Sequence, residues 1–112
     1  GLLCNNGTRQ VNLYQDLISK KGLELCMIPH SEQEKIEDII YNSEHGIKSL
    51  SYANEKVINN VELILNDLIN LKVDCIILGC SELPQAFNNK YYQNIEIINP
   101  VDILAKEMIK KM

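Results

Sequence analysis

The chain has 112 residues, enough for one domain with its own core, and 46 % of them are apolar, which excludes disorder as the default state. Its 11 basic and 15 acidic residues give a formal net charge of −4, and no more than two basic residues stand together, so a nucleic-acid-binding surface is not expected. No apolar run approaches the length of a membrane span and no signal-peptide pattern opens the chain, so a membrane location is not expected.

The first half of the chain alternates between strand and helix patterns. Apolar runs at residues 1–4 and 23–28 predict two buried strands. Between them, apolar residues recur at helical spacing and stop at Gly22, a residue typical of the end of a helix. Ser31 and Glu34 have the spacing of a capping box, which predicts a second helix there.

The second half repeats this alternation. Residues 57–68 carry the strongest helical stripe, and apolar runs at 73–79 and 95–98 predict a third and a fourth strand. The Asn-Pro pair at 99–100 is typical of an N-cap followed by a first-turn proline, so a last helix is predicted to begin there. Its apolar stripe within residues 101–108 is predicted to be buried.

This order of elements predicts an α/β fold. Strands separated by helix-length connections pair in parallel through right-handed crossovers. The expected architecture is a four-stranded parallel sheet that is doubly wound, with strand order 2-1-3-4 and helices on both faces. Residues 1–112 form a single lobe, because no linker, repeat or low-complexity tract divides them.

Two polar segments are expected to meet at one edge of this sheet. Ligands bind beyond the carboxyl ends of the strands where strand order reverses, here between the first and third strands, which end in "CNNGT" and "GCSE". We expect Cys80 to lie there in an open groove near Thr8, with its thiolate favoured because a short helix begins at Ser81 or Glu82. Asn6, Gly7 and Thr8 begin another helix, whose free N–H groups can hold a carboxylate or a phosphate.

Each of these features also has an ordinary structural explanation. A free cysteine is usually a small buried apolar residue, which is the interpretation favoured for Cys4, Cys26 and Cys75 and left open for Cys80. Lys48 is by default a solvated charge. With two histidines and no CxxC motif, neither a metal site nor a metal cofactor is expected. Cysteines placed in apolar runs rather than in loops indicate a reducing cytoplasm.

Three motifs resemble the aspartate/glutamate racemase family. "GLLCNNGTRQVNLYQ" resembles the opening of the second lobe of these enzymes, "DCIILGCSELP" resembles the segment that holds one of their two catalytic cysteines, and "INPVDILAKEM" resembles their usual ending. "HGIKSLSY" is a weaker match to a G-I-K-A-G stretch. The matches occur in order and span nearly the whole chain.

The resemblance implies a function. Family members invert an amino acid at Cα without pyridoxal phosphate, metal or any other cofactor, using a thiolate on one face and a thiol on the other. By resemblance, Cys80 is one acid/base catalyst, Ser81 binds the substrate α-carboxylate and residues 6–8 line the same site. Lys48 is expected to meet a side-chain carboxylate of the substrate. Glu82 indicates the aspartate-type branch, because glutamate racemases usually carry histidine there.

The sequence also departs from the family. The Pro-Cys-Asn-Thr segment that supplies the second catalytic cysteine is absent, and Cys4 stands where the family usually has a small residue. The chain, which opens at Gly1 in a strand-like run, is therefore expected to be the second lobe of a racemase and inactive alone, with a small amino acid as substrate and a missing N-terminal lobe or a second copy as partner. The alternative is a non-catalytic module that binds a small carboxylate or self-associates. A hydantoin racemase or an arylmalonate decarboxylase is a third option, against which "GCSEL" argues.

Overall fold

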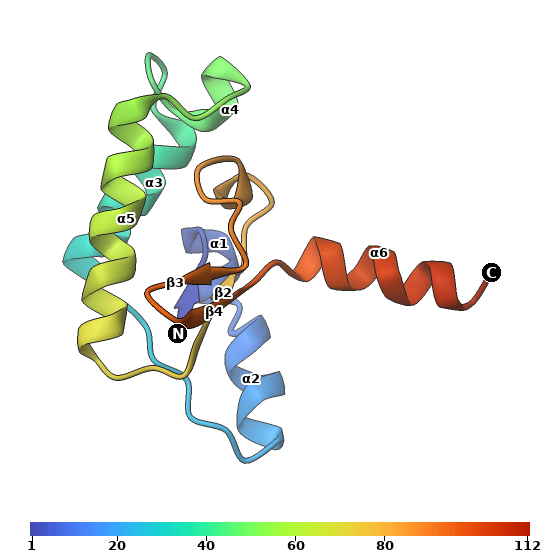
Figure 1. The fold of residues 1–112 in the computed structure, drawn as a ribbon. Coiled ribbons are helices and arrows are strands. Elements are labelled where there is room, and N and C mark those ends of the chain that lie inside the picture. Colours follow the sequence, from blue (N-terminus) through green and yellow to red (C-terminus); the bar gives the residue numbers. More distant parts are fainter.

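A single four-stranded sheet organises the chain. The computed structural model describes residues 1–112, with β1 (Leu2–Leu3), β2 (Cys75–Leu78), β3 (Tyr91–Tyr92) and β4 (Ile95–Ile98) in the order β1-β2-β4-β3 (Figure 1). β1 pairs with β2 and β2 with β4 in parallel, whereas β3 is antiparallel to β4. The α/β class is therefore confirmed, but the sheet is mixed and the prediction of a wholly parallel sheet is wrong.

The segment predicted as the second strand contributes a single bridge. Met27 pairs in parallel with Leu2, and the Leu2 N–H donates to the Cys26 carbonyl over 3.0 Å. Residues 23–28 thus lie along the side of β1 away from β2, where the order 2-1-3-4 places them, but one bridge does not make a strand.

The antiparallel strand β3 lies between the predicted third and fourth strands, where the sequence analysis expected no strand. Gln93 and Asn94, which join β3 to β4, have φ angles of 49° and 67°. Positive φ at both central residues of a two-residue connection is the geometry of a type I′ hairpin. Asn favours this backbone region, but Gln does not, so the hairpin signal at residues 93–94 is weak.

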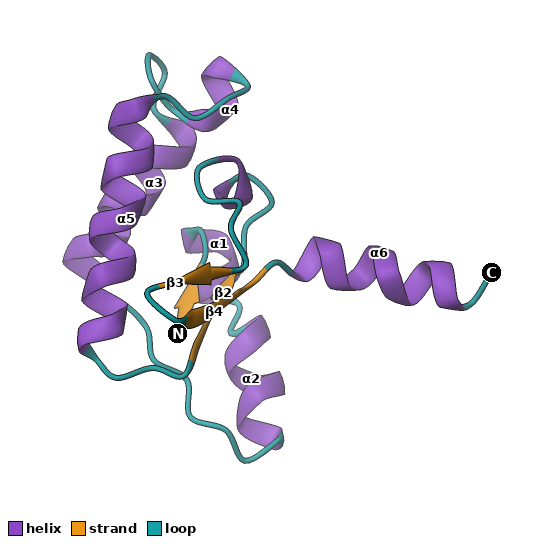
Figure 2. Cartoon of the chain, in the orientation of Figure 1, coloured by secondary structure: helices purple, strands orange, loops and turns teal.

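The chain also has six α-helices and one 3₁₀ helix (Figure 2). Their bounds are α1 (Asn6–Gln10), α2 (Leu13–Lys20), α3 (His30–Tyr41), α4 (Ile47–Leu50), α5 (Glu55–Asn70), the 3₁₀ helix η1 (Leu83–Gln85) and α6 (Pro100–Lys110). α3 and α5 pack along one another on one side of the sheet. None of these helices has both the length and the apolar character needed to cross a membrane.

The hydrophobic core lies between the sheet and the pair α3 and α5. The apolar stripe of α5 is buried along its whole length, as predicted, and the Asn54 side chain caps the helix by accepting from the Val57 N–H over 2.9 Å. Ile76 and Leu78 of β2 join the same cluster. Full burial of one such side chain stabilises the fold by about 1.5–3 kcal/mol, so this side of the sheet supplies most of the hydrophobic stabilisation.

The last helix does not pack as predicted. α6 projects away from the body of the chain (Figure 1), and every residue from 101 to 112 is exposed. Its apolar stripe includes Leu104 and Met108, each 59 % exposed. α2, on the other side of the sheet, also has no buried residue. The prediction that α6 buries a face is therefore wrong within this chain, and one side of the sheet lacks the cover expected of a doubly wound fold.

Candidate functional site

The site begins where β2 ends, at a glycine that leaves no room for a side chain. A Cβ at Gly79 would lie 2.9 Å from Leu2 Cδ1 and 3.2 Å from both the Leu3 carbonyl oxygen and Tyr14 Cε2. The Gly79 N–H donates to the Leu3 carbonyl over 2.7 Å. β1, β2 and α2 thus converge on this residue, and the next residue, Cys80, emerges at the carboxyl edge of the sheet.

Cys80 is held as a thiol beside a carboxylate. Its Sγ donates to Glu82 Oε2 over 2.8 Å, and the residue is 8 % exposed within the hydrophobic core cluster. Burial, followed by the hydrogen bond to Glu82, raises the pKa of Cys80 to about 11.

This finding corrects two expectations about Cys80. The helix that follows is the three-residue 3₁₀ turn η1, which begins at Leu83 rather than at Ser81, and its short length gives little dipole to favour a thiolate. The sulphur is also buried rather than set in an open groove, and none of the four main cavities of the chain is lined by Cys80.

Glu82 connects three polar side chains. Besides the Cys80 thiol, the Ser81 hydroxyl donates to its Oε2 over 3.2 Å, and Lys48 Nζ lies 3.4 Å from its Oε1. The hydrogen bond from Cys80 is the main cause that lowers the pKa of Glu82, and Lys48 adds to it. Glu82 is therefore ionised and accepts a hydrogen bond from the Cys80 thiol, which keeps the proton on the sulphur.

Lys48 connects this cluster to the start of α1. Its Nζ lies 5.2 Å from the centroid of the Tyr41 ring, within the range of a cation–π interaction. The Tyr41 hydroxyl in turn accepts from Asn5 Nδ2 over 3.0 Å. We call Cys80, Ser81, Glu82, Lys48 and Tyr41 the thiol cluster.

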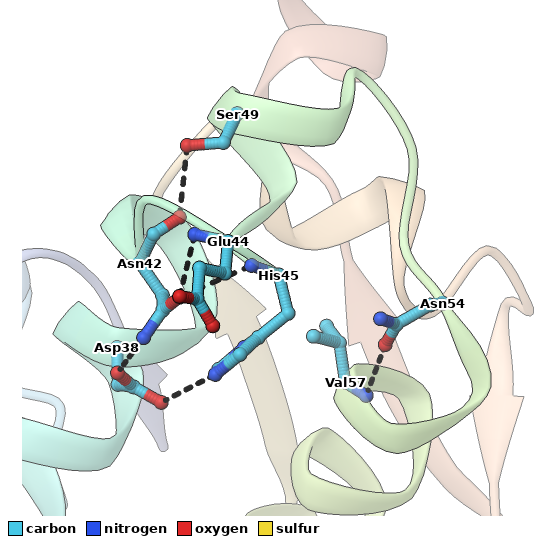
Figure 3. Close-up of polar contacts among 7 residues, drawn as sticks. All are labelled: Asp38, Asn42, Glu44, His45, Ser49, Asn54 and Val57. Carbon is cyan, nitrogen blue, oxygen red and sulfur yellow. Dashed lines mark hydrogen bonds and ion pairs between the residues drawn. The ribbon is translucent and has the colours of Figure 1, made fainter.

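The turn between α3 and α4, just before Lys48, is held by the polar contacts of Asn42 (Figure 3). Asn42 Oδ1 accepts from the N–H groups of Glu44 and His45 over 2.8 and 3.1 Å, and the Ser49 hydroxyl donates to the Asn42 carbonyl over 2.8 Å. A Cβ at Gly46 would collide with the backbone N and O atoms of Asn42. Only glycine fits there, so this residue allows the turn that carries Lys48 toward Glu82.

The amides at the start of α1 are already engaged. The Asn6 N–H donates to the Glu37 carboxylate, and the Thr8 N–H donates to Asn5 Oδ1 over 2.9 Å. No hydrogen bond joins Asn6, Gly7 or Thr8 to the thiol cluster. The expectation that free first-turn amides surround Cys80 is therefore not met in this conformation, although Asn5 links α1 to the cluster through Tyr41.

The other cysteines differ from Cys80 in their surroundings. Cys4 is 1 % exposed, and burial is the main cause that raises its pKa. Cys26 and Cys75 are half-buried, and all four cysteines are free. No group of three or more His, Cys, Asp and Glu side chains converges in the chain, so no set of residues here presents a metal site.

The structure places Cys80, Ser81 and Lys48 around one carboxylate, that of Glu82. The sequence analysis treated Glu82 only as a marker of the aspartate-type branch and did not single out Tyr41, which is 44 % exposed and lies under Lys48. The proximity of Glu82 to Cys80 along the chain was the available signal. No protein-family model matches the chain. The resemblance to the racemase family therefore rests on the motifs themselves.

Proposed function

We propose that this chain forms one half of the site of a cofactor-independent amino-acid racemase, acting on aspartate or a related acidic amino acid in the cytoplasm. The observation that carries the proposal is the thiol cluster at the carboxyl end of β2, where Cys80 Sγ donates to Glu82 over 2.8 Å and Lys48 lies 3.4 Å from the same carboxylate. A thiol can move a proton at carbon as a general acid or, once ionised, as a general base.

The proton transfers in this proposal pass through Cys80. Its Sγ proton leaves to water once the substrate has displaced the contact with Glu82, and the resulting thiolate removes the α-proton of the substrate, which leaves a carbanion whose charge spreads into the α-carboxylate. In the reverse direction the Cys80 thiol donates its proton to the carbanion. Inversion needs a second acid on the opposite face of Cα, which a partner must supply because Cys4 is buried.

Substrate binding would reorganise the cluster. Lys48 now pairs with Glu82, and an incoming side-chain carboxylate would compete for its ammonium group. The Ser81 hydroxyl is exposed and can turn from Glu82 to the α-carboxylate. Both changes would weaken the contacts that hold Cys80 as a thiol. Substrate binding would therefore favour the thiolate form of Cys80, which is the base.

The uncovered apolar faces support the need for a partner. The apolar stripe of α6 is not covered by anything in the chain, and that of α2 is covered only in part: Leu104 and Leu17 are 59 and 57 % exposed. Exposed apolar surface of this kind marks an interface. A second lobe or a second copy that covered it could also bring the second acid to the site.

One observation favours the alternative of a non-catalytic module. Cys80 is 8 % exposed and its pKa is raised to about 11, which describes a buried structural cysteine as well as a resting acid. In this interpretation Lys48 and Ser81 would bind a small carboxylate without chemistry.

Hydrogen exchange at Cα separates these two functions. The chain is incubated with L- or D-aspartate in heavy water, and loss of the α-proton signal is followed by NMR. If the half-site is catalytically active, the α-proton exchanges without racemisation. Cys80→Ser then abolishes the exchange, whereas Cys4→Ala leaves it unchanged. Binding of aspartate without exchange supports the module, and damage from Cys4→Ala rather than Cys80→Ser shows that the cysteines are wrongly assigned.

A further inference from the structure

A polar cavity lies apart from the thiol cluster. It has a volume of about 520 Å³, is lined by residues of α1, α2 and α3, and has no hydrophobic residue in its lining. None of its lining residues belongs to the thiol cluster. Cavities that bind small molecules usually have a largely apolar wall, so a wholly polar lining indicates a strongly hydrated or charged ligand.

A buried glutamine orients the only arginine of the chain in this cavity. Gln33 is 3 % exposed and is the only buried polar residue. Its Nε2 donates to the Cys4 carbonyl over 2.7 Å, and its Oε1 accepts from Arg9 Nη1 over 3.0 Å. Because one end of the amide is anchored to the backbone at the end of β1, the other end fixes the guanidinium in place.

The guanidinium has no anionic partner within the chain. Arg9 takes part in none of the four ion pairs, so its remaining N–H groups are available to a ligand. His30 lines the same cavity at the first turn of α3, and no side chain caps that helix. Arginine presents a planar fork of donors that matches a carboxylate or a phosphate, and a helix start adds to the attraction of an anion.

Two acceptors in the lining restrict the ligand further. Gln15 Oε1 is buried and has no hydrogen-bond partner, while its Nε2 donates to the Arg9 carbonyl over 3.3 Å. Glu34 lines the cavity with a carboxylate. A carboxylate only accepts hydrogen bonds, so an O–H or N–H group on the ligand would pair with Glu34 beside the anionic group.

We infer that this cavity binds a small oxyanion that also carries a hydrogen-bond donor, with its anionic group on Arg9. Hydrogen phosphate and small hydroxy carboxylates both have this chemistry. The inference does not depend on the racemase proposal, because it uses none of the residues of the thiol cluster.

The single arginine makes the test direct. In a ¹⁵N NMR titration the chain shows one arginine Nε–Hε signal, which reports on Arg9 alone. Inorganic phosphate and glycolate are added in separate titrations at constant ionic strength. We expect this signal to shift saturably with at least one of them, with a millimolar Kd, and the probe that saturates distinguishes phosphate from carboxylate. A linear shift without saturation for both probes overturns the inference.

Variants locate the binding. Calorimetry should show that Arg9→Gln weakens binding by about tenfold or more, whereas Lys20→Gln, an equal charge change on the exposed part of α2, has little effect. Gln33→Leu should weaken binding of the folded protein although Arg9 is retained. Equal effects of Arg9→Gln and Lys20→Gln would show that only net charge matters and would overturn the inference. Cys80→Ser should leave the affinity unchanged, which separates this test from that of the proposed function.

Discussion

Replacement of Glu82 by glutamine should lower the pKa of the Cys80 thiol. The pKa of Cys80 is raised from 9.0 to about 11, so at pH 8 about one molecule in a thousand carries the thiolate. Burial is the largest cause and remains in the variant, but the carboxylate 2.8 Å from the sulphur is removed and Lys48 is freed. We expect the pKa to fall by about one unit, which raises the thiolate population about tenfold.

Alkylation measured as a function of pH tests this expectation. Iodoacetamide labelling of Cys80 is followed by mass spectrometry with fragment ions that distinguish it from Cys75 on the same tryptic peptide. The pH midpoint is compared rather than the absolute rate, because burial slows the reagent in both proteins. Glu24→Gln, which removes one exposed negative charge elsewhere, is the matched control and should leave the midpoint unchanged.

An unchanged or higher midpoint in Glu82→Gln would refute the reasoning. It would mean that the Glu82 carboxylate does not hold Cys80 in its thiol form. Loss of this contact on substrate binding could then not produce the thiolate, and the proposed route to the thiolate would fail.

Three further predictions concern the structure around the site. Gly46→Ala should lower the free energy of unfolding in urea by about 1–3 kcal/mol, since its Cβ would collide with the Asn42 backbone; an unchanged midpoint would contradict this close approach. The neighbouring Asp67 carboxyl, then burial, raises the pKa of Glu32 above 4.5, so its stabilising contribution is present below pH 4.5 and is lost as the pH rises through the raised pKa. Glu32→Gln should therefore reduce the fall in the free energy of unfolding between pH 4 and pH 7. An identical slope in the variant would contradict the coupling of Glu32 to Asp67. The double change Leu104→Gln and Met108→Gln should reduce self-association in sedimentation runs without altering the free energy of unfolding, whereas a large loss of stability would show that α6 packs within the monomer.

Local patterns predicted the elements whose stability is local. The apolar stripe of α5 and its Asn54 cap are predictable from sequence, because helical spacing and capping depend on neighbours along the chain. The placement of Ser81 and Lys48 near Cys80 also followed from sequence, since the carboxyl ends of parallel strands share one edge and the racemase motifs carried Lys48 to the same site.

Features that depend on distant contacts were not predictable in this way. The apolar stripe of α6 predicts burial, but which surface covers it depends on elements that its own sequence does not specify. The burial of Cys80 arises because η1 and the core close over it, and the carboxylate of Glu82 reaches back to the sulphur. The hairpin at Gln93 required positive φ at a residue type that seldom adopts it.

The enantioselectivity of α-proton exchange tests the central claim most directly. A single base on one face of Cα reaches the proton of only one enantiomer, so the chain should exchange the α-proton of either L- or D-aspartate, with retention of configuration and only while Cys80 is present. Equal exchange of both enantiomers, or exchange that survives Cys80→Ser, would contradict the assignment of Cys80 as one half of a two-base site.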